Sequence, residues 1–382
     1  MVWGIPVVPT IAFGGESRGS AMRYFRAEIP ARAIAPYGWD AYSYDCLLAP
    51  TSKIEIDRDP RLRGTDMDDP RDVMPADVIT LRMRDDLDVT NIHAPPDMPE
   101  QVERARAAGQ VVLYDVDDDY WKIPEWSPAY DAKSEWDKRR RAHDVELMGA
   151  MMEACNAVTV STDAVAASVR ENTACTEVYV MRNGIDLDDF PAAKRHAGPL
   201  RVGWMGSASF HGEHLISIAD ALDVLGDYGA EFWHFGTSRD LRCEVLHNKI
   251  PAPVVGLEWR NFDLLMPLLS QVDIAIIPRW MGNSFAEGHS TSSGLEWAAA
   301  GVPYIATRTA EYAALAAKGC GRVAGTIAEW RKAFRDLLGA PRTYRRSVAR
   351  RGRDTAEREH GLEPTALAWL DMLDEVCVKA GV

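Results

Sequence analysis

Short apolar runs alternate with helical patterns along the whole chain. In the first half, four apolar runs predict strands: Ile5–Phe13, Val78–Arg82, Val111–Asp115 and Ala157–Ser161. The segments between them predict helices at Ser20–Ala35, Pro99–Ala108, Ser134–Glu153 and Thr162–Glu171. Strands that alternate with helices in this way are typical of a parallel α/β architecture.

A second series of the same kind begins at Leu200. Its expected strands are LRVGWMG from Leu200, Glu231–Phe235, Val272–Pro278 and Tyr304–Thr307. Its expected helices are Phe210–Leu225, Phe262–Ser270, a short helix around Glu296, Ala310–Ala317 and Thr326–Leu338. Pro, Gly and charged residues interrupt both patterns between the two series. We therefore expect a first Rossmann-like domain at 1–185, a linker at 186–199 and a second Rossmann-like domain at 200–355, with ligands in a central cleft.

The C-terminal tail, 356–382, contains an amphipathic helix at Pro364–Val378, which we expect to pack back on the first domain. Six arginines lie close together just before this tail, and they predict a solvated helix face or, alternatively, a surface for an anionic acceptor or a lipid. They are Arg342, Arg345, Arg346, Arg350, Arg351 and Arg353.

Composition narrows the class of protein. The 382 residues carry 43 Lys and Arg against 57 Asp and Glu, a net charge of −14, which argues against nucleic acid as the main partner. The N-terminus has neither a basic n-region nor a long apolar run, so neither a signal peptide nor a transmembrane segment is expected. The six cysteines form no CxxC pair and show no paired histidine spacing, which favours reduced thiols in a cytoplasmic protein.

The stretch Asn283–Thr307 carries the clearest chemistry. A loop rich in Ser, Gly and His leads into an Ala-rich helix that bears Glu296 near its start, and a Gly-Val-Pro turn and an apolar strand follow. The start of such a helix can hold an anion on its free backbone N–H groups. An acid one turn inside it can accept hydrogen bonds from two sugar hydroxyls. This combination favours a nucleotide-sugar pocket over a packing element.

Two glycine-bearing turns offer further phosphate contacts. Gly14 and Gly15 follow the first strand of the first domain, and Gly206 and Ser207 follow the first strand of the second. Glycines let the backbone approach a diphosphate closely, and each turn leads into a helix start. His211 lies just beyond the second turn. An N-cap region with a surface histidine is the alternative there.

A third group follows the strand at 111–115, where VLYDVDDDYW places several carboxylates together. Asp117 and Asp118 are the candidate catalytic or acceptor-orienting residues. A capping turn or a divalent metal site are the alternatives for the same residues.

Three segments together resemble the retaining glycosyltransferases of the two-Rossmann-domain GT-B class, in particular family four (group 1). VYVMRNGIDLDDF is similar to that family's interdomain segment, LRVGWMGS to the opening of its nucleotide-binding domain, and LEWAAAGVPYIAT to its donor helix. The last segment is the most specific of the three.

The resemblance implies a role for Glu296 in holding the ribose hydroxyls of the donor nucleotide. It also implies that Gly14 and Gly15, and the loop before Glu296, approach the phosphates and the donor sugar. The loop residues are Gly288, His289, Ser290, Thr291 and Ser292. Glu287 lies one residue away from the position of the family's first acid. No metal and no cofactor are implied.

One departure from the family concerns the diphosphate. Many members carry an Arg and a Lys after the first strand of the second domain, whereas GSASFHGEH has neither. His211, His214 and Arg279 therefore gain importance as diphosphate contacts. The resemblance implies a metal-independent, retaining transfer of a sugar from a nucleoside diphosphate sugar to an acceptor hydroxyl. The acceptor could be a protein, a polysaccharide or a lipid-linked glycan. A nucleotide-sugar epimerase, a phosphorylase and a catalytically degenerate binding protein are the alternatives on the same fold.

Overall fold

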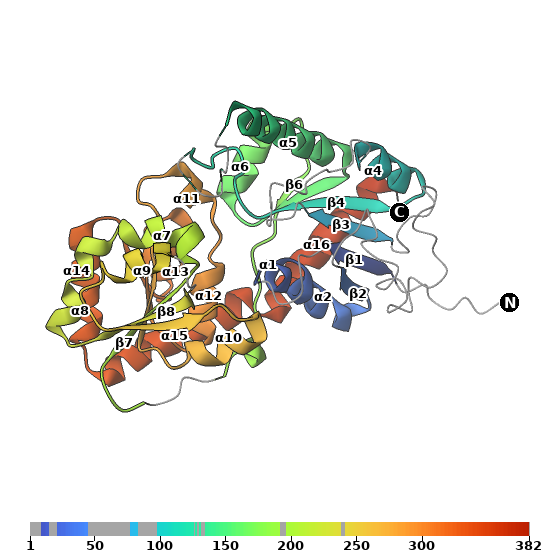
Figure 1. Ribbon diagram of the computed structural model, residues 1–382. Helices are drawn as coiled ribbons and strands as arrows, with labels where there is room; N and C mark the ends of the chain where they lie inside the picture. The colour runs from blue at the N-terminus through green and yellow to red at the C-terminus, as the bar shows by residue number, and fades with distance from the viewer. Residues whose placement is uncertain are drawn as a thin grey trace. The chain divides into compact units, whose positions relative to one another are not determined.

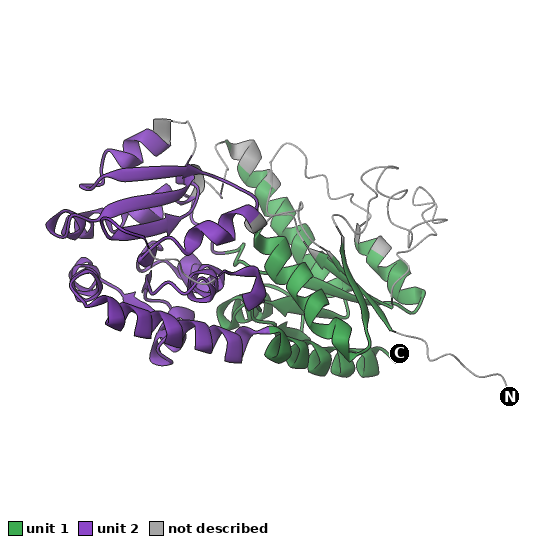
Figure 2. Ribbon diagram, turned by 90° about the horizontal axis from the view of Figure 1, so that it is seen from below, with its two compact units in different colours: residues 1–121, 131–184, 362–382 green, residues 122–130, 185–361 purple. Residues whose placement is uncertain are grey.

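The computed structural model describes residues 9–14, 21–44, 77–82, 98–125, 127, 130, 134–191, 196–237 and 241–381. The chain divides into two compact units, shown in Figure 2. Unit 1 comprises residues 1–121, 131–184 and 362–382, and unit 2 comprises residues 122–130 and 185–361. The functional domain boundaries expected from the sequence stay a prediction.

Unit 1 is built on a six-stranded parallel sheet with the order β2-β1-β3-β4-β5-β6. Its strands are β1 (Thr10–Gly14), β2 (Asp40–Tyr44), β3 (Val78–Arg82), β4 (Val111–Val116), β5 (Ala157–Val160) and β6 (Val178–Val180). Strands β4 and β5 are buried along their whole length, as expected for apolar runs covered on both faces.

The helices of unit 1 cover its sheet, and the last one comes from the C-terminus (Figure 1). They are α1 (Ala21–Arg23), the π-helical turn η1 (Tyr24–Glu28), α2 (Ile29–Ile34), η2 (Ala35–Tyr37), α4 (Met98–Ala107), α5 (Glu135–Ala154), α6 (Asp163–Asn172) and α16 (Leu362–Ala380). Helix α16 packs beside α2 and buries Trp369 against Phe13, with the ring centroids 5.0 Å apart. This confirms that the final helix packs on the first domain.

Unit 2 contains a second six-stranded parallel sheet with the order β12-β11-β10-β7-β8-β9. Its strands are β7 (Arg201–Met205), β8 (Glu231–Thr237), β9 (Val254–Glu258), β10 (Ile274–Ile277), β11 (Tyr304–Thr307) and β12 (Arg322–Ala324). Two parallel sheets with crossover helices confirm the predicted class of two Rossmann-like α/β domains.

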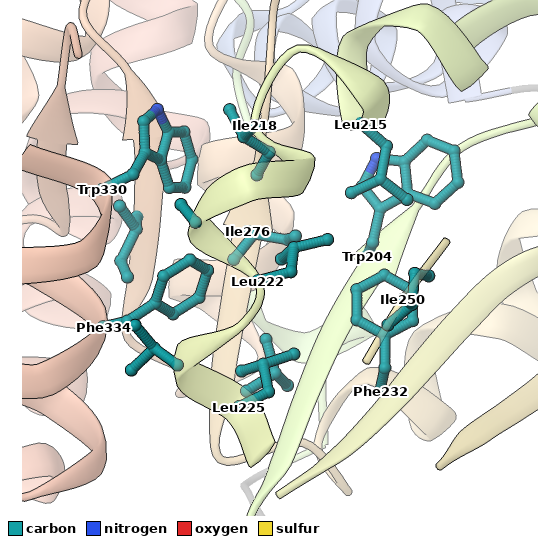
Figure 3. Close-up of a cluster of buried hydrophobic side chains, with 14 of the residues drawn as sticks. Trp204, Leu215, Ile218, Leu222, Leu225, Phe232, Ile250, Ile276, Trp330 and Phe334 are labelled. Carbon is teal, nitrogen blue, oxygen red and sulfur yellow. The ribbon is translucent and has the colours of Figure 1, made fainter. Parts of the chain in front are cut away.

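The helices of unit 2 bury a large apolar core against its sheet. They are η4 (Leu187–Asp189), α7 (Ala208–Ile216), η5 (Ala219–Ala221), α8 (Val224–Asp227), α9 (Leu241–His247), α10 (Phe262–Leu269), α11 (Ser284–Gly288), α12 (Ser292–Ala299), α13 (Ala310–Ala317), α14 (Ile327–Leu338) and α15 (Arg342–His360). Figure 3 shows Trp204 and Phe232 of the sheet and Trp330 and Phe334 of α14 within this core. Fully burying a side chain of this size contributes roughly 1.5–3 kcal/mol, so the core fixes the strands that carry the site.

Two expectations from the sequence differ from the structure. The helix expected at Phe210–Leu225 breaks after Ile216, where the Ser217 hydroxyl donates to the His214 carbonyl oxygen at 2.6 Å. The arginine group is also not simply a solvated face. Arg345 is buried and donates to the Ala340 carbonyl oxygen at 2.5 Å, and Arg353 donates to the carbonyl oxygens of Leu187 and Ala299.

The strand order locates the place where each unit is expected to bind a ligand. In unit 2 the order reverses between β7 and β10, because β8 and β9 extend the sheet on one side and β11 and β12 on the other. In unit 1 the reversal lies between β1 and β3. Ligands of open parallel sheets bind outside the carboxyl ends of the strands at this switch point.

Candidate functional site

The carboxyl end of β7 forms one side of the switch point in unit 2. The strand ends at Met205 and is followed by Gly206, whose N–H donates to the Phe235 carbonyl oxygen at 3.0 Å. A Cβ atom at Gly206 would lie 2.9 Å from the Trp204 ring, so a larger residue does not fit there without a shift. Glycine therefore lets the Trp204 ring pack directly against the backbone of this turn.

Helix α7 begins directly after this turn and carries two of the candidate histidines. Ser207 is its N-cap residue, and the Ser207 hydroxyl makes no capping hydrogen bond to the helix. His211 is half-buried and His214 is buried, and their rings stack with centroids 5.5 Å apart. Burial lowers the pKa of His214, and the Arg279 charge lowers it further, so His214 is a neutral imidazole at pH 7.

Helix α12 places Glu296 at the same edge of the sheet. Thr291 is its N-cap, Ser292 its first residue and Glu296 its fifth. Glu296 is only 2% exposed, and burial raises the pKa of its carboxyl to about 8, an effect that the Arg279 charge partly opposes. Within the part of the chain that the structure describes, no group donates a hydrogen bond to this carboxyl. A buried acid in this state gains by accepting hydrogen bonds from a ligand.

Arg279 follows β10 and lies on the other side of the switch point. Its backbone is fixed by Thr307 at the end of β11, since the Arg279 N–H donates to Thr307 Oγ1 at 2.8 Å and Thr307 Oγ1 donates back to the Arg279 carbonyl oxygen at 3.1 Å. Its charge acts on both Glu296 and His214. Its Nε is buried and makes no hydrogen bond to the described residues. The guanidinium is therefore a cation available to an anionic ligand beside Glu296.

The loop before α12 adds one more imidazole. His289 packs against Phe285 with ring centroids 4.5 Å apart and lies 6.4 Å from the His214 ring centroid. Gly288 is buried, Ser290 is half-buried and Thr291 is buried. The loop thus brings His289 to the histidines of α7, beside the start of α12.

Glu287 has a different position from the other loop residues. It is exposed, and its Oε2 accepts a hydrogen bond at 3.0 Å from the N–H of Ala310, the first residue of α13. A carboxylate at a helix start is stabilised by the orphan N–H groups and the helix dipole. In this structure Glu287 caps α13, and its role as a donor contact stays a prediction.

In unit 1, Gly14 ends β1 at the switch point, whereas Gly15 lies outside the described residues. Asp117 is buried, and its carbonyl oxygen accepts a hydrogen bond from the Ser161 hydroxyl at 2.6 Å. Asp118 is half-buried. Both follow the carboxyl end of β4, the edge of a parallel sheet at which ligands bind.

A buried ion pair beside these residues was missed by the sequence analysis. Arg26 of η1 forms a two-pronged contact with Asp115, with Nε donating to Oδ2 at 3.0 Å and Nη2 donating to Oδ1. The Thr159 hydroxyl also donates to Asp115 at 2.6 Å, and Arg26 Nη1 donates to Asn183 Oδ1 at 3.1 Å. The network ties Asn183 of the NGID segment to β4. No local sequence pattern points to this pair, because its two residues are separated by 89 positions in the sequence.

Comparisons with known proteins identify the architecture. No family model matches the chain, and no curated protein sequence matches it. Among solved structures, sucrose-phosphate synthase from Thermosynechococcus elongatus has a TM-score of 0.65 and 12% identity, covering 97% of this chain and 100% of that chain. HepE of Anabaena, solved with UDP and glucose, has a TM-score of 0.63 and 12% identity, covering 95% and 99%.

A third similar structure is WaaG, a glycosyltransferase involved in lipopolysaccharide biosynthesis, with a TM-score of 0.57, 15% identity, and coverage of 96% of this chain and 99% of that chain. The chain has the GT-B fold. Unit 2 contains the segment that resembles the donor helix of family-four glycosyltransferases. The switch point of the same unit brings together Gly206, Arg279 and Glu296. Of the helices that the structure describes, none is long and apolar enough to cross a membrane.

Proposed function

We propose that this protein is a glycosyltransferase that moves a sugar from a nucleoside diphosphate sugar to an acceptor hydroxyl. The single observation that carries the proposal is the buried Glu296 carboxyl beside the Arg279 charge, at the switch point of a Rossmann-like sheet. The GT-B fold and the resemblance of Leu295–Thr307 to a family-four donor helix support the same reading.

Glu296 is proposed to hold the two ribose hydroxyls of the donor nucleotide. Its carboxyl meets no donor among the described residues, and two vicinal hydroxyls supply two donors at a spacing that one carboxylate can accept. Because the ionised form accepts both bonds, nucleotide binding is expected to lower the pKa of Glu296 and release a proton. Affinity for the nucleotide should therefore increase as the pH rises from 7 toward 9.

The diphosphate is proposed to lie against the starts of α7 and α12. These helices supply backbone N–H groups at Ser207–Ala208 and Ser292–Ser293, and Arg279, His211 and His289 lie beside them. Gly14 and Gly15 of unit 1 are proposed as further phosphate contacts. Together these donors replace the Arg and Lys that many family members use, and they stabilise the charge that develops on the leaving diphosphate.

The acceptor side is proposed to involve Asp117 or Asp118 of unit 1. The bond from the sugar C1 to the diphosphate oxygen breaks, a bond from C1 to the acceptor oxygen forms, and the acceptor hydroxyl loses its proton. One of these carboxylates orients that hydroxyl or takes its proton. Retention of the anomeric configuration and independence of divalent metal are part of the proposal.

Turnover tests this proposal. The protein is incubated with UDP-, GDP-, ADP- and dTDP-sugars after chelation, with water as the acceptor. Release of the nucleoside diphosphate is measured with and without added Mg²⁺ or Mn²⁺. We expect one class of donor to be consumed at a rate that added metal does not change. Glu296→Gln should reduce this rate at least about 10-fold, and Glu258→Gln, at an exposed edge-strand position, should not.

Failure to consume any donor would contradict the transferase proposal. A rate that depends on added Mg²⁺ or Mn²⁺ would contradict metal independence alone. The anomeric configuration of the sugar product, read by proton NMR, decides between retention and inversion.

A further inference from the structure

Three side chains with metal-binding atoms converge beside the middle of β8, and none of them is proposed to bind the donor. They are His234 of β8 and Cys243 and His247 of α9. His234 Nδ1 lies 2.8 Å from His247 Nε2, and the Cys243 Sγ lies 3.5 Å from His247 Nε2 and 3.9 Å from His234 Nδ1. Among the described residues, no other group of three His, Cys, Asp or Glu side chains converges in this way.

Local structure explains the convergence. Cys243 and His247 are four residues apart on α9, and this spacing places them on one face of a helix. His234 is fully buried, and its ring packs on Trp204 with centroids 4.5 Å apart. Cys243 is buried and His247 half-buried. The cluster is thus held by the core on one side and reachable from solvent at His247.

The Nε2 atom of His234 already makes a hydrogen bond to the backbone. His234 Nε2 lies 2.8 Å from the Gly206 carbonyl oxygen, which can only accept, so Nε2 carries the proton and Nδ1 presents a lone pair to Cys243 and His247. A metal-bound histidine commonly donates its other N–H to a backbone carbonyl in this way.

The distances fit a tetrahedral zinc ion. Zinc bond lengths of roughly 2.0–2.1 Å to nitrogen and about 2.3 Å to sulfur place two tetrahedral nitrogens roughly 3.4 Å apart and a nitrogen and a sulfur roughly 3.6 Å apart. The two sulfur–nitrogen distances lie close to that value, and the nitrogen–nitrogen distance must open by about half an ångström. His247 is half-buried, so its side chain has more room to move than those of His234 and Cys243.

We propose that His234, Cys243 and His247 bind one zinc ion through two imidazole nitrogens and a thiolate. This donor set of borderline and soft ligands favours zinc over magnesium or calcium, which prefer oxygen. Three protein ligands leave the fourth position to a water molecule. Binding releases the Cys243 thiol proton to solvent, so no redox step is involved.

The site would also stiffen the turn after β7. The ion fixes the His234 ring, and the ring donates to the carbonyl oxygen of Gly206. The zinc proposal does not depend on the proposed transferase activity, because it rests on three side chains that do not belong to the donor site. The test below uses neither a nucleotide nor turnover, so the two proposals can fail separately.

Metal binding to the full-length protein tests the site. The protein is treated with a chelator, freed of it, and titrated with Zn²⁺ by calorimetry. A separate metal-free sample is titrated with Co²⁺ as a spectroscopic probe. We expect about one Zn²⁺ per chain and a thiolate-to-cobalt charge-transfer band in the near ultraviolet. Cys243→Ala should lose the band and weaken Zn²⁺ binding on the order of 100-fold.

His247→Ala should weaken Zn²⁺ binding to a similar extent, and because His247 is half-buried it provides a second variant if Cys243→Ala does not fold, as checked by circular dichroism. Cys320→Ala is the matched control, since Cys320 is another buried cysteine of unit 2 and lies outside the cluster. It should keep both the affinity and the band. Absence of stoichiometric Zn²⁺ binding, or wild-type affinity in folded Cys243→Ala or His247→Ala, would overturn the proposal.

Discussion

Each unit has a buried carboxylate at the carboxyl edge of its sheet, Asp115 in unit 1 and Glu296 in unit 2, and the two differ in what surrounds them. In unit 1, Asp115 receives hydrogen bonds from both arms of the Arg26 guanidinium and from the Thr159 hydroxyl. In unit 2, Glu296 is equally buried, but no described group donates to its carboxyl and only the Arg279 charge opposes the rise in its pKa.

This difference separates a structural carboxylate from one prepared for a ligand. A buried charge costs several kcal/mol unless it is paired and hydrogen-bonded, and Asp115 meets that requirement within the protein. Glu296 does not, and it is held instead as an acid whose pKa is about 8. A strongly shifted pKa in a buried side chain is typical of functional sites, so the contrast with Asp115 supports a ligand at Glu296.

Breaking the buried Arg26–Asp115 ion pair should have the largest effect on stability. Arg26→Met leaves Asp115 buried without its cation, and we expect a loss of about 3–5 kcal/mol in the free energy of unfolding, measured by urea denaturation. Arg32→Met is the control, because Arg32 is exposed and lies 4.0 Å from Glu28; it should change stability by less than about 1 kcal/mol. Equal effects of the two variants would mean that the Arg26–Asp115 pair is not the structural element we describe.

Replacing the Glu296 carboxyl should change the free energy of unfolding by about a few kcal/mol, in a way that depends on pH. The folded pKa of Glu296 is raised above its unfolded value, so the wild type loses stability as the pH rises from about 4.5 through about 8. Glu296→Gln cannot ionise and should escape this loss. We expect the variant to match the wild type near pH 5 and to exceed it in urea denaturation at pH 9, without nucleotide. Parallel pH profiles for the two proteins would argue against a raised pKa.

Removing the Arg279 charge should weaken nucleotide binding and leave the stability of the fold largely unchanged. Arg279→Met deletes a cation beside the proposed diphosphate and lets the pKa of Glu296 rise further. Loss of one charge-assisted contact corresponds to about 10- to 100-fold in nucleoside diphosphate affinity by calorimetry. Arg308→Met is the control, since Arg308 is exposed and pairs with Glu329 at 3.0 Å. An unchanged affinity in Arg279→Met would remove Arg279 from the site.

The smallest expected effect concerns His214. Its folded pKa lies below its unfolded value, so its contribution to stability is present above about pH 6.5 and is lost as the pH falls. His214→Phe should therefore lose less stability than the wild type between pH 6.5 and pH 5, by up to about 1.4 kcal/mol per pH unit. Thermal unfolding at a series of pH values measures this. Identical acid sensitivity would show that His214 is protonated in the folded protein.

The fold was largely predictable from the sequence because the central strands are buried on both faces. Val78–Arg82 and Tyr304–Thr307 have the predicted bounds, and the predicted β4 and β10 differ by a few residues at most. Strands β2, β9 and β12 were not predicted. They lie at the sheet edges, where short strands such as Val254–Glu258 keep their residues partly exposed and differ little in pattern from loops.

The site was predictable only where neighbouring residues carry the chemistry. Glu296 follows from a local pattern of loop, helix and Gly-Val-Pro turn. Arg279 and His214 were singled out because the turn after β7 has no Arg or Lys, and the structure places Arg279 close enough for its charge to act on both Glu296 and His214. The Arg26–Asp115 pair and the His234–Cys243–His247 cluster were missed, because each joins residues from separate elements, and α9 is too short to show a helical pattern.

The most direct test of the central claim is nucleotide binding by wild type and Glu296→Gln. Calorimetry at pH 8.5 with UDP, GDP, ADP and dTDP measures affinity under conditions in which the Glu296 carboxyl can ionise. We predict that the wild type binds at least one of the four and that Glu296→Gln binds it about 10- to 100-fold more weakly, while Glu258→Gln binds it as the wild type does. Equal affinity of wild type and Glu296→Gln, or no binding of any of the four nucleotides, would contradict the claim that Glu296 holds the donor.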